Sequence, residues 1–277
     1  MKLLEKLRAE KESDLHGGIY HKLQVDFAYN SNHIEGSRLT HDQTRYIYET
    51  NSIGIGIDKS EQAVNVNDII ETINHFRCFD LVLATVNDPL NESYIKQLHS
   101  TLKSGIVDKY AIIGEFKKES NFVCDISTAA PEEVAGQIRK LLTDYDQTHM
   151  TLYDIANFHM QYEKIHPFYD GNGRTGRLIM FKQCLQNGIV PFIVDDRDKM
   201  FYYMGLKEWQ VNNKSERLIN VFLSAQDTMC ANLDYFGIGY ERKTSTYNEE
   251  IALAKERIMH KNKVRSKAQS QKGIGRK

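Results

Sequence analysis

Residues 166–177 read HPFYDGNGRTGR and stand between two apolar stretches with helical spacing. Pro167 ends the preceding helix, because a proline disfavours the helical conformation of the residue before it. Gly171 and Gly173 give the backbone the freedom to curl at the junction with the next helix. The segment therefore predicts a helix, a tight loop and a second helix, with His166 presented on the loop.

Most of the rest of the chain also has helical patterns. Thr40 and Gln43 form a capping box, Asn67 and Asn91 suit helix N-caps, and Pro131 suits the first position of a helix. Helices are predicted near residues 23–35, 40–48, 67–86, 91–102, 131–142, 152–165, 175–186, 197–210 and 215–236. No internal repeat and no Gly/Ser linker interrupts them, which favours one helical domain.

Residues 109–126 differ from this pattern. Bulky apolar residues flank the polar sequence KKESN there, which predicts a short β-hairpin with its turn at those residues. These residues are Ile112, Ile113, Phe116, Phe122, Val123 and Ile126. The expected fold class is all-α with one short β-hairpin.

The sequence indicates a cytoplasmic protein. Its longest apolar stretch, residues 81–86, is far shorter than the roughly 20 residues that span a bilayer, and the charged N-terminus lacks the apolar region of a signal peptide. The four cysteines, Cys78, Cys124, Cys184 and Cys230, contain no CxxC pair. This spacing suits neither a zinc site nor a disulfide framework, so buried free thiols are expected.

The net charge of -1 combines two unlike regions. Residues 241–277 carry 11 basic and 4 acidic side chains, whereas residues 1–240 carry 25 and 33. The basic end is typical of a solvated helix terminus. A contact with nucleic acid or with an acidic protein is the alternative interpretation.

The segment 166–177 combines residue types that suit phosphate chemistry. His166 has a side chain whose ordinary pKa allows proton transfer near neutral pH. The glycines at the start of the second helix can form an anion-binding nest of N–H groups, which the helix dipole strengthens. Asp170 is a hard oxygen ligand for Mg²⁺. Arg174 and Arg177 lie on one helix face and can bind phosphate oxygens in a bidentate manner.

This string resembles the signature of the Fic family, H-P-F-x-[D/E]-G-N-G-R-x-x-R, at all nine specified positions. The resemblance implies a helical fold with a β-hairpin flap and transfer of AMP from ATP and Mg²⁺ to a hydroxyl side chain of a protein. His166 would be the catalytic base, and Asp170 would hold the metal. The implied ATP-binding segment is Gly171, Asn172, Gly173, Arg174, Thr175, Gly176 and Arg177.

Within that segment, the resemblance places Asn172 at the α-phosphate, Arg174 at the β-phosphate and Arg177 at the γ-phosphate. Doc-type phosphotransferases of the same superfamily replace the first glycine by alanine and the first arginine by lysine. Gly171 and Arg174 are intact here, which favours AMP transfer over phosphate transfer.

A second motif, SNHIEG at residues 31–36, resembles the Fic inhibitory motif [S/T]-x-x-x-E-[G/N]. Glu35 lies in the last turn of a predicted helix, where the helix dipole disfavours an acidic residue, so a partner elsewhere is expected. The resemblance implies an ion pair between Glu35 and Arg177 that occupies the place of the γ-phosphate. Ser31 would steady the inhibitory helix.

Further contacts are implied by the resemblance alone. Val123 and Cys124 of the flap would touch the nucleotide, and Tyr202 and Gln210 would face adenine, although core packing would also account for the tyrosine. The implied division is residues 1–50 for N-terminal helices with the inhibitory motif, 51–236 for the catalytic core with its flap at 109–126, and 237–277 for a C-terminal helix and basic tail.

Two other functions stay open at this stage. Glu35 could orient a water that removes AMP from a modified target. Alternatively, the chain could bind a nucleotide without turnover and use its basic tail for nucleic acid. Relatives of this class also include homodimers and proteins that modify themselves, so both are possible partners beside a target protein.

Overall fold

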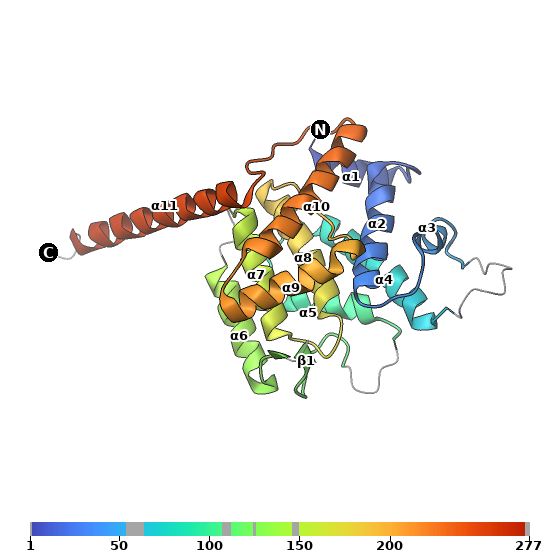
Figure 1. Cartoon of the computed structure of the whole chain (residues 1–277), viewed down its shortest axis with the longest axis horizontal. Helices are drawn as coiled ribbons and strands as arrows, with labels where there is room; N and C mark the ends of the chain where they lie inside the picture. Colours follow the sequence, from blue (N-terminus) through green and yellow to red (C-terminus); the bar gives the residue numbers. More distant parts are fainter. Residues whose placement is uncertain (1, 54–63, 107–111, 124–125, 146–149, 275–277) are drawn as a thin grey trace.

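Helices make up most of the regular structure in this computed structural model, which describes all residues except 1, 54–63, 107–111, 124–125, 146–149 and 275–277 (Figure 1). The elements are α1 Leu3–Glu12, α2 Ile19–Ile34, α3 His41–Thr50, α4 Val66–Ala84, α5 Glu92–Lys103, β1 Phe122–Val123, β2 Ile126–Ser127, α6 Pro131–Asp144, α7 Leu152–Ile165, α8 Asn172–Asn187, the 3₁₀ helix Asp196–Asp198, α9 Lys199–Asn212, α10 Glu216–Tyr235 and α11 Tyr247–Ile274. The helical character expected from the sequence is confirmed.

Several predicted helix starts are present. The capping box of α3 is complete, because Gln43 N donates to Thr40 Oγ1 at 3.1 Å and Thr40 N donates to Gln43 Oε1 at 2.9 Å. Asn91 Oδ1 accepts from Tyr94 N at 2.8 Å at the start of α5. Pro131 occupies the first position of α6. Local capping chemistry therefore sets where these helices begin.

Two predicted helix starts are shifted. Asn65 caps α4, not Asn67, and its Oδ1 accepts from Asn67 N at 3.0 Å. Helix α8 begins at Asn172, three residues earlier than predicted. Its N-cap is Gly171, whose φ of 80° lies in the left-handed region that glycine adopts without strain, so the chain turns directly from the loop into the helix.

The predicted β-hairpin flap over residues 109–126 is wrong. Residues 112–121, the described part before β1, form turns and bends and contain no strand. In the described residues the strand pairing is limited to β1 and β2, which run antiparallel with Phe122 opposite Ser127 and Val123 opposite Ile126. This two-residue ladder begins after the KKESN sequence, so the turn does not lie at those residues.

The side chains of that sequence explain the difference. Lys117 is buried and donates from Nζ to Asn121 Oδ1 and to Thr128 Oγ1, both at 2.6 Å. Asn121 Nδ2 donates to the main-chain oxygen of Phe168 at 3.0 Å. Lys117 and Asn121, at the two ends of the predicted polar turn, therefore point inward and hold the loop between α7 and α8, whereas Lys118, Glu119 and Ser120 between them are exposed.

Helix α8 runs through the core and brings together elements that are distant in the sequence. The rings of Phe27 on α2, Phe79 on α4 and Phe181 on α8 contact one another, with centroids 5.3–6.0 Å apart. Helix α7 also packs against α8. This packing places the end of α2 beside the first turns of α8.

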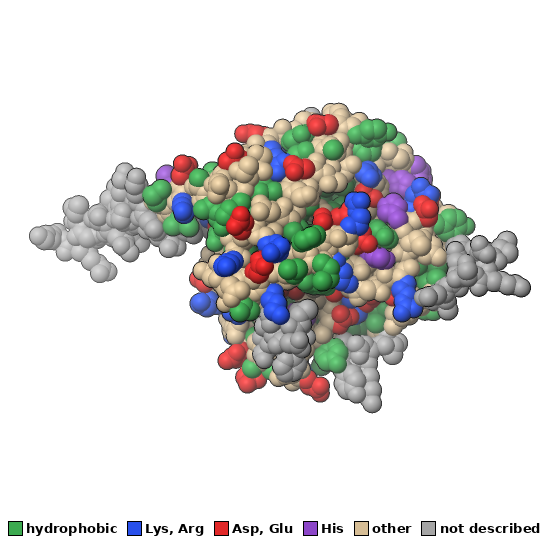
Figure 2. All heavy atoms as spheres, in the orientation of Figure 1, with side chains coloured by type: hydrophobic (Ala, Val, Ile, Leu, Met, Phe, Trp, Pro, Cys, Tyr) green, Lys and Arg blue, Asp and Glu red, His purple; other side chains and the backbone are tan. Residues whose placement is uncertain are grey.

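Helix α11 leaves the body of the molecule and extends away from it (Figure 1). Arg257 Nη1 pairs with Asp154 Oδ1 at 2.9 Å near the point of departure. Acidic and basic side chains are interspersed over the face seen in Figure 2. None of the described helices combines the length and the apolar character that a membrane span requires. Cys78, Cys184 and Cys230 are buried free thiols, as expected, and Cys124 lies outside the described residues.

Candidate active site

His166 forms the C-cap of α7 in a left-handed backbone conformation, with φ of 51° and ψ of 64°. Its main-chain N donates to Tyr162 O at 2.9 Å. This conformation is strained for a residue other than glycine, so the surroundings must hold it in place. The next residue, Pro167, accepts at its main-chain oxygen from Lys117 N at 2.9 Å. The predicted position of His166, on the loop immediately after a helix, is confirmed.

Phe168 anchors the loop in the core. Its side chain is fully buried and stacks on the His99 ring, with centroids 3.8 Å apart and planes 4° apart. His99 in turn bridges the loop to another segment, because its Nε2 lies 3.1 Å from Asp170 O and its Nδ1 accepts from Gly114 N at 3.0 Å. These two bonds require the neutral imidazole with its proton on Nε2.

Asn172 closes the loop with its side chain. Its Oδ1 accepts from Phe168 N and its Nδ2 donates to Phe168 O, both at 2.8 Å. The first turn of α8 leaves N–H groups without helical partners, and these groups are the ones that can bind an anion. The Asn172 amide thus holds the loop, while the main-chain N–H of this residue is one of the groups at the helix start.

Arg177 is buried in contact with the end of α2. Its Nη2 donates to Glu35 Oε1 at 2.7 Å and to Ser31 O at 2.9 Å, and its Nε donates to Ser31 Oγ at 3.1 Å. The ion pair expected between Glu35 and Arg177 is therefore present. Ser31 binds the arginine directly, and these bonds attach the end of α2 to α8.

Arg174 belongs to a second ion-pair cluster. Its Nη1 lies 2.5 Å from Glu71 Oε2, and its Nη2 lies 3.2 Å from Asp170 Oδ2. Lys103 Nζ lies 2.5 Å from Glu71 Oε1 and 2.6 Å from Asp170 Oδ2. Although burial acts the other way, Arg174 and Lys103 hold the pKa of Asp170 well below its usual range. Asp170 is therefore a carboxylate at neutral pH.

The surroundings of His166 keep its imidazole neutral. Burial and then the nearby Lys117 ammonium lower the pKa of His166 to about 4, although the Glu35 carboxylate opposes them. One turn earlier on α7, burial raises the pKa of Glu163 to about 8, and Glu35 adds to the rise. At neutral pH the site thus holds an uncharged imidazole, which can accept a proton.

Tyr202 and Gln210, expected at an adenine base, lie on α9 next to α7. Tyr202 is buried and its hydroxyl lies 2.6 Å from His159 Nε2, while Gln210 Nε2 donates to Met160 O at 3.4 Å. Both therefore have partners on α7. Val123 lies in β1 with only its backbone described, and Cys124 lies outside the described residues, so no contact of either side chain is assigned.

Asp170 is the candidate ligand for Mg²⁺, and its side chain is 45% exposed. Among the described residues, no three His, Cys, Asp or Glu side chains cluster as a protein-made metal site. Mg²⁺ is commonly held by one or two carboxylates together with substrate phosphates. A single exposed carboxylate beside the free N–H groups at the start of α8 fits a divalent cation that binds together with a phosphate-containing substrate.

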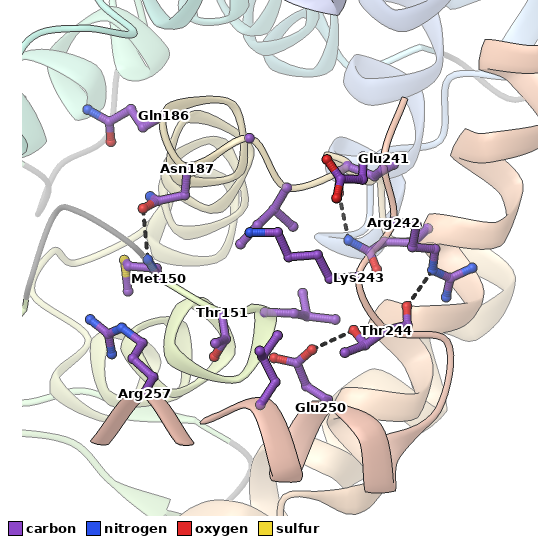
Figure 3. Close-up of a pocket in the computed structure, with 16 residues that line it drawn as sticks. Met150, Thr151, Gln186, Asn187, Glu241, Arg242, Lys243, Thr244, Glu250 and Arg257 are labelled. Carbon is purple, nitrogen blue, oxygen red and sulfur yellow. Dashed lines mark hydrogen bonds between the residues drawn. The ribbon is translucent and has the colours of Figure 1, made fainter. Parts of the chain in front are cut away.

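A cavity of about 420 Å³ lies between the start of α7, the end of α8 and the connection from α10 to α11, away from segment 166–177 (Figure 3). Its polar groups already bind one another: Thr244 Oγ1 donates to Glu250 Oε2 at 2.6 Å, and Met150 N donates to Asn187 Oδ1 at 2.9 Å. Glu250 Oε1 also accepts from Tyr153 N on α7 at 2.8 Å, and this bond attaches the C-terminal segment to the core. The cavity does not include any residue of segment 166–177.

Sequence reasoning missed four residues of the site: Glu71, Lys103, Lys117 and Glu163. The first three come from α4, from α5 and from the segment before β1, so their place beside the loop depends on tertiary packing. Glu163 gave a signal that was overlooked, because it lies three residues before His166 on the same helix.

The fold and the site together define a helical protein with a neutral loop histidine beside the glycine-capped start of a buried helix. Residues 89–184 match the model of the Fic/DOC family. The segment that contains the His166 loop and most of α8 is therefore similar to the Fic/DOC family.

Curated relatives show the same similarity. The protein adenylyltransferase Fic of Nematostella vectensis is 27% identical over 225 residues, which cover 77% of this chain and 50% of that protein. That of Drosophila willistoni is 30% identical over 185 residues, covering 65% of this chain and 35% of the relative. The chain thus spans half or less of the length of these relatives.

Solved structures show the same fold. A Fic domain-containing signaling protein from Bacteroides thetaiotaomicron superposes with a TM-score of 0.65 at 22% identity, covering 87% of this chain and 99% of that one. The helical arrangement described above is therefore the arrangement of a known fold.

Proposed function

We propose that this chain is a self-inhibited protein adenylyltransferase, which transfers AMP from ATP to a hydroxyl side chain of a target protein or of the chain itself. The observation that carries the proposal is the uncharged His166 beside the first turn of α8, within a loop that also supplies Arg174 and Arg177. The names of the curated relatives support the same activity.

In the proposed reaction, His166 accepts the proton of the target hydroxyl, and the hydroxyl oxygen forms a bond to the α-phosphorus. The bond between that phosphorus and its bridging oxygen breaks, and pyrophosphate leaves. Arg174 and Arg177 bind the β- and γ-phosphates, and the main-chain N–H groups at the start of α8 bind the α-phosphate. Asp170 would hold Mg²⁺, which supplies positive charge to the phosphates.

Self-inhibition follows in this proposal from the position of Glu35. Its carboxylate accepts from Arg177 Nη2 at 2.7 Å, so the arginine is occupied in the resting chain. A γ-phosphate that needs the same guanidinium has to displace the carboxylate. The Glu35 side chain is 26% exposed, whereas that of Arg177 is 2% exposed. The glutamate is thus the partner that can leave the site.

The test is labelling with ATP that carries ³²P at the α-phosphate. Wild type is compared with Glu35→Gly and with the double variant Glu35→Gly, His166→Ala, both alone and in a cell lysate. Labelling is expected to rise in the first variant and to disappear in the second. Glu12→Gly is the matched control, since Glu12 is an exposed glutamate at the end of α1, and its labelling should equal that of wild type.

Two outcomes would contradict the proposal. Labelling that survives His166→Ala would show that another group acts as the base. Labelling by ATP that carries ³²P at the γ-phosphate, without labelling by ATP that carries it at the α-phosphate, would assign phosphate transfer. Mass spectrometry of the labelled band then distinguishes a target protein from the chain itself.

A further inference from the structure

Glu71 and Lys103 form an ion pair at the phosphate-binding start of α8, and no motif of the sequence predicted it. Glu71 comes from α4 and Lys103 from the last residue of α5. Their carboxylate and ammonium groups lie 2.5 Å apart, with side chains 14% and 4% exposed. We refer to these two residues as the Glu71–Lys103 pair.

Each member of the pair contacts one functional residue of segment 166–177. Glu71 Oε2 lies 2.5 Å from Arg174 Nη1, and Lys103 Nζ lies 2.6 Å from Asp170 Oδ2. The anion of the pair thus lies on the arginine proposed to bind the β-phosphate. The cation lies on the carboxylate proposed to hold the divalent metal.

The four groups balance one another. Glu71 and Asp170 are acidic and Lys103 and Arg174 are basic, so the cluster is neutral although most of it is buried. Buried charges need partners of opposite sign, and removing one partner is strongly destabilising. A triphosphate with its divalent cation would bring the same two contacts, an anion for Arg174 and a cation for Asp170.

The arrangement parallels the contact between Glu35 and Arg177. Both arginines at the start of α8 are paired with a carboxylate from an earlier part of the chain. Arg177 pairs with Glu35, directly after α2, and Arg174 pairs with Glu71 on α4. The two contacts use different helices and different arginines. Removing one carboxylate therefore leaves the other in place.

We propose that the Glu71–Lys103 pair is an internal substitute for a phosphate and its divalent cation, which the nucleotide and metal must displace to occupy Arg174 and Asp170. The inference rests on the part of the proposed function that concerns binding of ATP. It does not depend on transfer of AMP.

Calorimetric titration of the whole chain with ATP and with AMP, both with Mg²⁺, tests the anion. Glu71→Gln is expected to tighten ATP binding by about tenfold, the equivalent of one lost charge-assisted contact, in wild type and in Glu35→Gly. AMP has no β-phosphate to reach Arg174, so its affinity should not change. Glu92→Gln, in the partly exposed pair with Lys96 on α5, is the matched control.

Electron paramagnetic resonance of Mn²⁺ in the presence of ATP tests the cation, because free and bound Mn²⁺ differ in signal. Lys103→Met is expected to lower the Mn²⁺ concentration needed for half-saturation by about tenfold, since Asp170 no longer has a competing ammonium. Lys96→Met is the control and should leave this concentration unchanged. The double variant Glu71→Gln, Lys103→Met removes both charges together, so it tests both effects without leaving either member of the pair unpartnered.

Weaker ATP binding in Glu71→Gln would overturn the inference, because Glu71 would then orient Arg174 toward the phosphate. Equal changes for ATP and AMP would overturn it too, since the effect would not come through Arg174. An unchanged or raised Mn²⁺ requirement in Lys103→Met would overturn the part that concerns the cation. If ATP binds as expected but Glu35→Gly transfers no AMP, the proposed function fails and the inference stands.

Discussion

Ser31 and Arg177 are joined by two hydrogen bonds although 146 residues separate them in the sequence. One reaches the Ser31 hydroxyl at 3.1 Å, and the other reaches its main-chain oxygen at 2.9 Å. The end of α2 thus holds the arginine through three acceptors, of which the Glu35 carboxylate is one. The serine of the motif contributes to the contact itself.

Ser31→Ala is expected to release the proposed self-inhibition in part. It removes the hydroxyl but keeps the main-chain oxygen and Glu35, so about 1 kcal/mol of the contact is lost. Labelling from ATP should rise by about fivefold and stay below that of Glu35→Gly. Ser37→Ala, whose hydroxyl accepts from Leu39 N, is the control. Labelling at the wild-type level in Ser31→Ala would refute this role.

Asn172→Ala is expected to destabilise the fold by about 2 kcal/mol or more. Both ends of the Asn172 amide bind the main chain of Phe168, and the substitution leaves buried donor and acceptor groups unsatisfied. Urea unfolding followed by circular dichroism measures the change. Asn220→Ala, an exposed position on α10, should lose nothing. A stability equal to that of wild type would mean that water replaces the amide.

Gly205→Ala is expected to destabilise the contact between α9 and α10 by about 1–3 kcal/mol. An added Cβ would lie 2.8 Å from Leu218 N and 2.9 Å from Leu218 Cα, which are main-chain atoms that cannot yield. Gly136→Ala on α6 is the matched control, since its Cβ would meet nothing within 4 Å. That variant should gain about 0.5–1 kcal/mol, because alanine is the better helix former. Thermal unfolding of both variants measures the contrast.

The free energy of unfolding is expected to fall as the pH drops below about 6.5, the ordinary pKa of histidine. Burial lowers the pKa of His75 and of His159 to about 3 and that of His99 to about 4. Below 6.5 the unfolded chain takes up these protons and the folded chain does not, so each residue costs up to about 1.4 kcal/mol per pH unit. Urea unfolding at pH 7.5 and pH 5 measures the slope.

His75→Phe should reduce that slope by the contribution of one histidine, up to about 1.4 kcal/mol per pH unit. Neither ring nitrogen of His75 has a hydrogen-bond partner among the described residues, and its ring meets Phe27 with centroids 5.0 Å apart. An aromatic ring without nitrogens fits the same contact. A slope that stays unchanged would mean that His75 is protonated in the folded state.

The sequence predicted those features that depend on neighbouring residues. The capping box of Thr40 and Gln43, the helix start at Pro131 and the loop position of His166 all follow from local chemistry, and all are present. Glu35 could be paired with Arg177 because an acidic residue at a helix end needs a partner. Motif resemblance then indicated which arginine it was.

The remaining features depend on tertiary packing. Lys117 and Asn121 looked like a polar turn, but both side chains are used to hold the loop between α7 and α8, so the predicted hairpin does not form there. Glu71 and Lys103 meet Arg174 and Asp170 only because α4 and α5 pack against α8. No spacing along the chain encodes that meeting.

The carboxylates of Glu35 and Glu71 also bear on how the resting chain folds. Two guanidinium groups buried at the start of α8 would each cost several kcal/mol without a counter-charge, and breaking such a pair typically costs about 3–5 kcal/mol. The glutamates supply that counter-charge in advance, so the chain can fold before any nucleotide is bound. A variant that lacks both glutamates would depend on a bound polyphosphate ligand for part of its stability.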